Sequence, residues 1–246
     1  MTNARCAHLL ALAAAFASCQ GANPTATSPT AATVPARDEA SVKPGINKDF
    51  LDPKLEVKKY EERFEGESRE IFVHRARIAA LLDLQPGRVV ADVGAGTGLY
   101  TRMFAQKLGN ETAVYAVDIA KQFVDHVVQD AHTRGLLNVV GVVCTERSVE
   151  LPKASVDVVF VCDTYHHFEY PKQTLASIRD SLRPGGDLFV VDFIRIPGTS
   201  REWILEHVRA GQDVVTQEIE AAGFVKVRDE ATPFLKENYA MRFKRT

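Results

Sequence analysis

Five runs of almost uninterrupted aliphatic residues constrain the fold of this chain more than any other feature. They occupy residues 88–94, 113–118, 139–145, 156–163 and 187–193, and stretches with helical spacing separate them. Strands that are apolar on both faces belong to parallel sheets covered by helices on both sides. Two more strands, at 224–230 and 238–245, have no helix between them, so one of this pair is expected to be antiparallel. We predict an α/β domain with a doubly wound, mostly parallel seven-stranded sheet.

A helical lead-in is expected before the first strand. Ile71, Ile78 and Leu82 lie seven and four residues apart, which predicts a helix over residues 69–84. The composition is that of an ordinary globular protein, with 246 residues, 46% hydrophobic residues and a formal net charge of −2. This charge argues against a non-specific nucleic-acid binder, which needs a basic surface.

The first 50 residues differ from the rest of the chain. MTNARCAHLLALAAAFASC contains one cation, a short Ala/Leu-rich run and small residues before Cys19, which is the layout of a secretory signal peptide over residues 1–19. Ala15-Phe16-Ala17 suits ordinary signal peptidase, whereas FASC resembles a lipobox in which Cys19 is lipidated. Residues 20–50 are expected to form a disordered tether, and residues 51–246 the folded domain. We therefore expect an exported protein, periplasmic or anchored to the membrane at Cys19, with a cytoplasmic location as the alternative.

The remaining cysteines are expected to be free thiols. Cys6 leaves with the signal peptide, and Cys144 and Cys162 end two of the apolar runs. The expected strand order places these two residues roughly 14 Å apart. That separation is too large for a disulfide bond.

The segment ADVGAGTGLY, residues 91–100, places three glycines within five positions directly after the first strand. Ligands of doubly wound sheets bind beyond the carboxyl ends of the strands. Gly94 and Gly96 would let the backbone approach a ligand closely, and the next helix is expected to offer unpaired N–H groups to an anionic group. A dinucleotide fingerprint needs glycine where Leu99 stands, and a phosphate-binding P-loop needs Gly-Lys-Ser/Thr, which is absent.

With Asp92 in front of it, the loop reads D-x-G-x-G-x-G and resembles the class I S-adenosylmethionine-dependent methyltransferases. Three further motifs support the resemblance: VYAVD, which ends in Asp118, then SVDVVFVCDTYHHFEYP and SLRPGGDLFVVDF. The resemblance spans roughly residues 55–244. It implies a Rossmann-like methyltransferase fold, S-adenosylmethionine as the cofactor and a small-molecule methyl acceptor, as in quinone biosynthesis and general metabolism, with no nucleic-acid partner.

The resemblance also implies which residues contact the cofactor. The loop from Gly94 to Gly98 would lie under the methionine moiety, ordered by Asp92. Asp118 would accept hydrogen bonds from the ribose hydroxyls, and Ile119 would pack against adenine. Purely structural roles are the alternative, in which Asp92 caps the loop and Asp118 caps the next helix.

The contact to the adenine amino group is less clearly marked. Glu146 is the candidate, but Arg147 and Ser148 stand where acidic residues are common in the family. The predicted cofactor-binding residues are Asp92, Gly94, Ala95, Gly96, Gly98, Asp118, Ile119, Glu146 and Asp163.

Candidate catalytic residues follow the fourth strand. Methyl transfer is a displacement at an already activated carbon, so alignment and a dry site matter more than a general base. Tyr165, His166 and His167 are the candidates, because a histidine there would take a proton from a hydroxyl or amine. The alternative for both histidines is packing beneath the cofactor. A metal site of Asp163, His166 and His167 has suitable ligand types but no distant partner, so no metal is predicted.

Other side chains are weaker candidates for the site. Asp192 ends the fifth strand, and Tyr100 follows the glycine loop. His207 lies on a helix that either covers the site or faces solvent, and Trp203 on the same helix is expected to pack rather than to stack on a substrate. Residues 60–70 form either a flap over the cofactor or a solvated helix.

An enzyme is the leading hypothesis. The expected export separates the chain from the cytoplasm, where S-adenosylmethionine is made. The second hypothesis is therefore a non-catalytic protein of the cell envelope that binds S-adenosylmethionine or a nucleoside.

Overall fold

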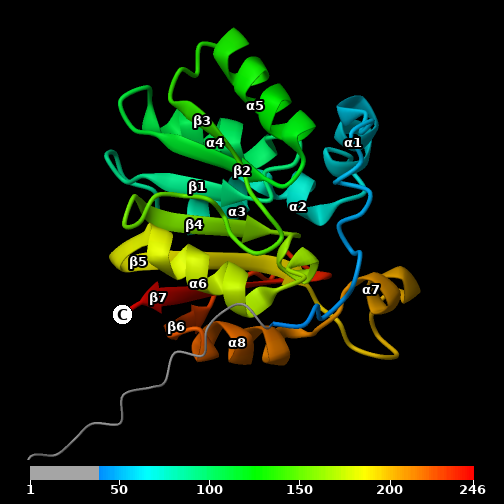
Figure 1. The fold of residues 1–246 in the computed structure, drawn as a ribbon. Helices are drawn as coiled ribbons and strands as arrows, with labels where there is room; N and C mark the ends of the chain where they lie inside the picture. The colour runs from blue at the N-terminus through cyan, green and yellow to red at the C-terminus, as the bar shows by residue number, and fades with distance from the viewer. Residues whose placement is uncertain (1–38) are drawn as a thin grey trace, which may run out of the picture. The chain divides into compact units, whose positions relative to one another are not determined.

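The computed structural model describes residues 39–246 (Figure 1). The predicted signal peptide, the lipidation candidate Cys19 and the first part of the predicted tether lie outside the described residues. Within residues 39–246, no helix combines the length and the apolar character needed to cross a bilayer.

A seven-stranded sheet lies at the centre of the described domain (Figure 1). Its strands are β1 (Val90–Val93), β2 (Val114–Asp118), β3 (Val139–Val143), β4 (Val156–Cys162), β5 (Leu182–Phe193), β6 (Phe224–Asp229) and β7 (Asn238–Arg245). They lie in the order β3-β2-β1-β4-β5-β7-β6, and β1 to β5 pair in parallel. β7 runs antiparallel to both β5 and β6. The predicted fold, including one antiparallel strand in the closing pair, is confirmed.

Helices cover both faces of this sheet, which explains why the strands are apolar throughout. In β4, Val158 and Phe160 pack into one hydrophobic cluster, whereas Val159 and Val161 pack into the other. The first cluster takes residues from α3 (Arg75–Leu81), α4 (Leu99–Leu108) and α5 (Lys121–Thr133). The second takes residues from α6 (Pro171–Ser181) and α8 (Gln212–Ala221).

The lead-in is helical, but the predicted helix over residues 69–84 is not continuous. α1 (Val57–Phe64) comes first, and a break at His74 then separates α2 (Glu70–Val73) from α3. The Tyr100 hydroxyl donates to the Ile71 carbonyl oxygen at 2.9 Å, and Arg75 Nη1 donates to the Phe72 carbonyl oxygen at 2.7 Å. These side chains satisfy carbonyl groups that a continuous helix would have used.

Residues 39–50 belong with the domain, whereas the sequence predicted a tether up to residue 50. The Glu39 carboxylate accepts hydrogen bonds from the backbone N–H groups of Lys172 and Gln173, at 2.8 and 2.9 Å, in the first turn of α6. The Asn47 side chain donates to the His167 carbonyl oxygen at 3.1 Å. Polar contacts of this kind leave no apolar periodicity in the sequence, so the boundary placed at residue 51 was too late.

The carboxyl ends of β1, β2 and β4 lie at one edge of the sheet. Helices α1, α2 and α7 (Glu202–His207) lie beside this edge, on the right in Figure 1. A short 3₁₀ turn, η2 (Tyr165–His167), follows β4 at the same edge.

Candidate functional site

A cavity of about 460 Å³ opens at the carboxyl ends of β1, β2 and β4. This volume lies within the range of about 300–1,000 Å³ that is usual for small-molecule sites. The predicted site residues that line it are Asp92, Gly94, Ala95, Gly96, Asp118, Ile119, Glu146, Asp163, His166 and His167. Gly98 and Tyr165 are not part of its wall.

The structure contradicts the catalytic role predicted for Tyr165. Its side chain is fully buried in the layer that contains α6 and α8. Its hydroxyl donates to Glu218 Oε2 at 2.8 Å, and Arg209 pairs with the same carboxylate. Successive residues of a 3₁₀ turn point in directions about 120° apart. Tyr165 therefore faces the core while the two following histidines face the cavity.

The structure also contradicts a cofactor contact for Gly98. This residue is the N-cap of α4 and has a φ of +85°, and a Cβ atom there would lie 2.8 Å from a methyl group of Val127. Glycine is needed at this position because α4 and α5 pack closely, not because a ligand approaches.

The Thr164 side chain packs closely against Gly94. Its φ is +76°, and a Cβ atom at this position would lie 2.2 Å from Thr164 Oγ1. The loop after β1 and the loop after β4 are therefore in direct contact. The bare backbone at Gly94 serves this contact between two loops.

Three backbone N–H groups of the glycine loop are already paired within the protein. The N–H groups of Gly94 and Ala95 donate to the Val117 carbonyl oxygen at 2.8 and 3.1 Å. The N–H group of Gly96 donates to Asp118 Oδ2 at 2.8 Å. The end of β2 thus fixes the shape of the loop before any ligand binds.

Asp118 has a structural role and also faces the cavity. Its second oxygen, Oδ1, accepts the backbone N–H of Ala120 at 2.9 Å, at the start of α5. Burial raises the pKa of Asp118 to about 6. Each carboxylate oxygen has two acceptor sites, so one backbone bond to each oxygen leaves capacity for a ligand hydroxyl. The remaining acceptor capacity of Asp118 fits the hydroxyl groups of a ribose.

Two further buried carboxylates line the cavity. Asp92 accepts a hydrogen bond from the Thr101 hydroxyl at 2.7 Å, and burial raises the pKa of Asp92 to about 7. Asp163, with a φ of +47°, pairs with Arg69 and accepts from Asn238 Nδ2 at 2.6 Å. Burial raises the pKa of Asp163 to about 6, although Arg69 opposes the shift. Both carboxylates connect elements that surround the cavity.

The segment after α1 is clamped onto the glycine loop. Glu65 accepts the Thr97 hydroxyl at 2.7 Å and binds the Arg102 guanidinium through both carboxylate oxygens at 2.8 Å. Tyr60 and Phe64 of α1 contribute to the cavity wall. Part of the 60–70 segment therefore borders the cavity, as the flap hypothesis expected.

Glu146 lies in the cavity wall together with Asn47. Burial and the neighbouring Glu169 raise the pKa of Glu146. The Arg147 guanidinium stacks on the Tyr170 ring, 3.4 Å from its centre. Glu146 and Asn47 are thus two of the polar residues in this wall. Sequence reasoning missed Asn47 because it lay in the predicted tether.

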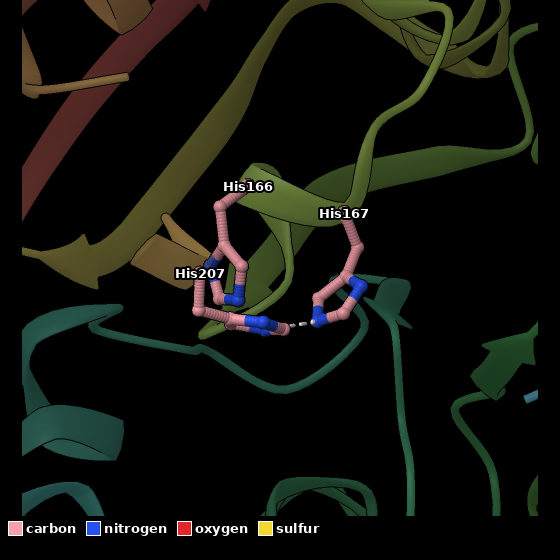
Figure 2. A group of neighbouring side chains, drawn as sticks. All are labelled: His166, His167 and His207. Atoms are coloured by element: carbon pink, nitrogen blue, oxygen red, sulfur yellow. Dashed lines mark hydrogen bonds between the residues drawn. The ribbon is translucent and has the colours of Figure 1, made fainter. Parts of the chain in front are cut away.

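Three histidines converge at the other end of the cavity (Figure 2). Asp192 Oδ1 accepts from His166 Nδ1 at 2.8 Å, and Asp192 Oδ2 accepts from the His166 backbone N–H at 3.0 Å. His207, from α7, places its Nε2 atom 3.2 Å from Nε2 of His167. Burial, reinforced by the neighbouring His166, lowers the pKa of His167 to about 2 and that of His207 to about 4. Such rings stay neutral and are weak proton acceptors.

His207 and Trp203 complete this end of the cavity wall. The Trp203 ring packs edge-on against Phe193, with 5.0 Å between ring centres. The end of β5 lies beside the end of β4 in the sheet, which brings Asp192 next to His166. No local pattern in the sequence connects α7 to either histidine of η2.

Comparisons with known proteins agree with this geometry. Residues 91–190 match the methyltransferase domain family. A SAM-dependent methyltransferase from Aquifex aeolicus superposes with a TM-score of 0.67 and 24% identity, covering 78% of this chain and all of that chain. The chain has the Rossmann-like methyltransferase fold.

The chain is similar in sequence to two classes of methyltransferase. The ubiquinone/menaquinone biosynthesis C-methyltransferase UbiE of Bordetella avium is 32% identical over 114 residues, which is 46% of this chain and 44% of that protein. Phosphoethanolamine N-methyltransferase of Triticum aestivum is 29% identical over 165 residues, which is 63% of this chain and 32% of that protein. The chain therefore spans less than half the length of either relative. These matches support S-adenosylmethionine as the cofactor.

Proposed function

We propose that this chain is an S-adenosylmethionine-dependent methyltransferase that acts on a small-molecule acceptor. One observation carries the proposal: a single cavity joins the glycine loop and Asp118 at one end to three histidines at the other. When bound, the cofactor supplies an activated methyl group on a sulfonium sulfur. The chain then needs to bind the cofactor and the acceptor, align them with each other and exclude water.

The glycine-loop end suits the cofactor. Its backbone is fixed by β2, so little order has to be gained when a ligand binds. Asp118 is assigned to the ribose hydroxyls, and the adjacent Ile119 to the adenine ring. Glu146 and Asn47, which share the wall near Glu169, are assigned to the polar edge of adenine.

The histidine end suits the acceptor. His166, His167 and His207 face the same cavity, and Trp203 and Phe193 add an aromatic border. Because cofactor and acceptor share about 460 Å³, the space left for the acceptor is that of a small molecule or of one end of a larger one. The two relatives, a ubiquinone/menaquinone biosynthesis C-methyltransferase and a phosphoethanolamine N-methyltransferase, support this class of acceptor.

The test is to incubate the purified chain with methyl-labelled S-adenosylmethionine and a metabolite extract, and to identify labelled products by mass spectrometry. We expect label in a small molecule, and much less label with Asp118→Asn than with the exposed control Asp125→Asn. Calorimetry with S-adenosylhomocysteine runs in parallel. Binding without any transfer would favour the non-catalytic binding protein, and the absence of binding would contradict both hypotheses.

A second proposal concerns location. The leader over residues 1–19 supports export, and the FASC sequence supports a lipid anchor at Cys19. Fractionation of cells that express the chain tests this. Cys19→Ser is expected to release the protein from the membrane fraction, and a variant that still sediments with membranes would reject the anchor.

A further inference from the structure

The three histidines lie close enough together to serve as ligands of one metal ion. Each of His166, His167 and His207 offers one ring nitrogen, and these three nitrogens lie within 4.8 Å of one another (Figure 2). The Nε2 atoms of His167 and His207 are 3.2 Å apart. Two histidine nitrogens bound to a tetrahedral zinc ion at about 2.0–2.1 Å are separated by about 3.3 Å. The observed pair is thus already at ligand spacing.

The carboxylate beside His166 is the partner that metal-binding histidines usually have. Asp192 and His166 are both buried, and the Asp192 carboxylate holds the ring nitrogen Nδ1 and the backbone N–H of His166. A carboxylate at Nδ1 favours the proton on that nitrogen and leaves the lone pair on Nε2. Histidines that bind metals almost always donate their other ring N–H in this way.

The backbones that carry the other two rings are also fixed. Lys43 Nζ donates to the His207 carbonyl oxygen at 2.6 Å, at the end of α7. Asn47 Nδ2 donates to the His167 carbonyl oxygen at 3.1 Å. The segment around residues 43–47 therefore connects α7 to η2. The three rings are held together before any ion binds, which is the arrangement that a metal site requires.

The protein alone does not satisfy this group of rings. The Nε2 atoms of His167 and His207 face each other at 3.2 Å, and at most one of them can donate to the other. A metal ion that accepts the Nε2 lone pairs of both rings removes this competition, whereas packing does not.

We propose that His166, His167 and His207 bind one divalent transition-metal ion of the zinc class, with an open coordination position towards the cavity. Three neutral imidazoles with an open fourth position form the ligand set of catalytic zinc sites. Imidazole also suits copper, iron and nickel, so the ligands alone define the class of ion. The set differs from the one weighed on the sequence, because Asp163 is occupied by Arg69 and Asn238.

The role of the ion rests on the proposed methyltransferase function. An acceptor hydroxyl or thiol binds at the open position and loses its proton to water, because a zinc-type ion lowers the pKa of bound groups to near 7. Its lone pair then forms the bond to the methyl carbon while the carbon–sulfur bond of the sulfonium breaks. The electron pair of that bond goes to sulfur and leaves a neutral thioether.

Cobalt(II) is the probe for the site, because its visible absorption reports coordination by nitrogen ligands. The full chain, without an affinity tag, is stripped with a chelator and titrated with Co²⁺. We expect one equivalent to bind with a visible band. His207→Ala should weaken binding at least about a hundredfold, since loss of even an outer partner typically costs about 10–100-fold. The matched control His132→Ala, an exposed histidine of α5, should bind as the wild type does.

A second variant tests the carboxylate. Asp192→Asn keeps the shape of the side chain and should weaken Co²⁺ binding by about 10–100-fold. Calorimetry with S-adenosylhomocysteine shows whether each variant keeps its cavity. The proposal is overturned if the wild type takes up no stoichiometric Co²⁺, or if His207→Ala takes it up equally well. Co²⁺ binding without any binding of S-adenosylhomocysteine would instead overturn the proposed function and leave the metal site standing.

Discussion

The two ends of the cavity are built in opposite ways. At the glycine loop, the N–H groups of Gly94, Ala95 and Gly96 and both oxygens of Asp118 have partners within the protein. At the histidine end, His167 Nδ1 has no partner among residues 39–246, and two ring nitrogens face each other at 3.2 Å. At the glycine loop, hydrogen bonds within the protein fix the backbone before a ligand binds. At the histidine end, the facing nitrogen lone pairs are available to an added ligand.

The difference predicts different responses to substitution. Changes at the glycine loop should act on folding and on cofactor affinity together, because the same bonds serve both. Changes at the histidine end should act on metal binding and turnover, with little effect on cofactor affinity. The Co²⁺ titrations test the histidine end. Four further experiments, from the largest expected effect to the smallest, test the glycine-loop end and the position of Tyr165 outside the cavity.

Gly94→Ala should cause the largest loss of stability. Its Cβ atom would lie 2.2 Å from Thr164 Oγ1 at a φ of +76°, so backbone strain and crowding add to about 2–5 kcal/mol. Gly87→Ala is the matched control, because Gly87 has a φ of +83° and open space around it. Denaturant unfolding should show a loss of only about 1–2 kcal/mol for the control. Equal losses for the two variants would mean that the contact with Thr164 is unimportant.

Asp118→Asn should weaken S-adenosylhomocysteine binding by roughly 10–100-fold. The variant replaces charge-assisted hydrogen bonds to the ribose, which are worth about 1.5–3 kcal/mol. Calorimetry at pH 8 measures the effect, with Asp125→Asn as the control. Asp125 is an exposed carboxylate in the first turns of α5 that pairs with Lys121. Unchanged affinity in Asp118→Asn would remove Asp118 from the proposed cofactor contacts.

The affinity for S-adenosylhomocysteine should fall as the pH drops through about 6. Burial raises the pKa of Asp118 to about 6, and only the carboxylate form accepts two charge-assisted bonds. The same shift means that the folded state binds this proton more tightly than the unfolded state. The contribution of Asp118 to stability is therefore present below about pH 4 and lost as the pH rises to about 6. In Asp118→Asn the pH dependence of affinity should be shallower, with a remainder from Asp92 and Asp163, whose pKa values are about 7 and about 6. A profile identical to that of the wild type would assign the titration to these other groups.

Tyr165→Phe should have the smallest effect and should act on stability alone. The variant removes the hydrogen bond to Glu218, which still has Arg209 as its partner, so the loss should be about 1 kcal/mol. Cofactor affinity and methyl transfer should not change, because Tyr165 lies outside the cavity wall. A large drop in turnover with normal unfolding would return Tyr165 to the catalytic residues.

Sequence patterns located the glycine-loop end of the cavity because its parts are local, whereas the cofactor contacts assigned to these residues stay predictions. Asp92, the glycines and Asp118 lie at the ends of two neighbouring strands, and each motif follows directly from an apolar run. The errors there concerned packing. Gly98 contacts Val127 of α5, and a one-dimensional motif does not separate a glycine needed by a ligand from one needed by a helix.

The histidine end was only partly predictable because it is assembled from distant segments. His166 and His167 follow β4, but His207 comes from α7, and the segment with Lys43 and Asn47 was assigned to a tether. These segments meet through polar contacts that leave no periodic signal in the sequence. Tyr165 was misassigned because a 3₁₀ turn sends adjacent side chains in different directions, which a pattern of residue types does not show.

The contact between Gly94 and Thr164 has a mechanical consequence. Thr164 stands two residues before His166, so the glycine loop lies directly against the segment that leads into the turn with the first two imidazoles. There is no room for a side chain at position 94. Glycine at this one position is therefore what allows the two loops to stand side by side and to share a single cavity.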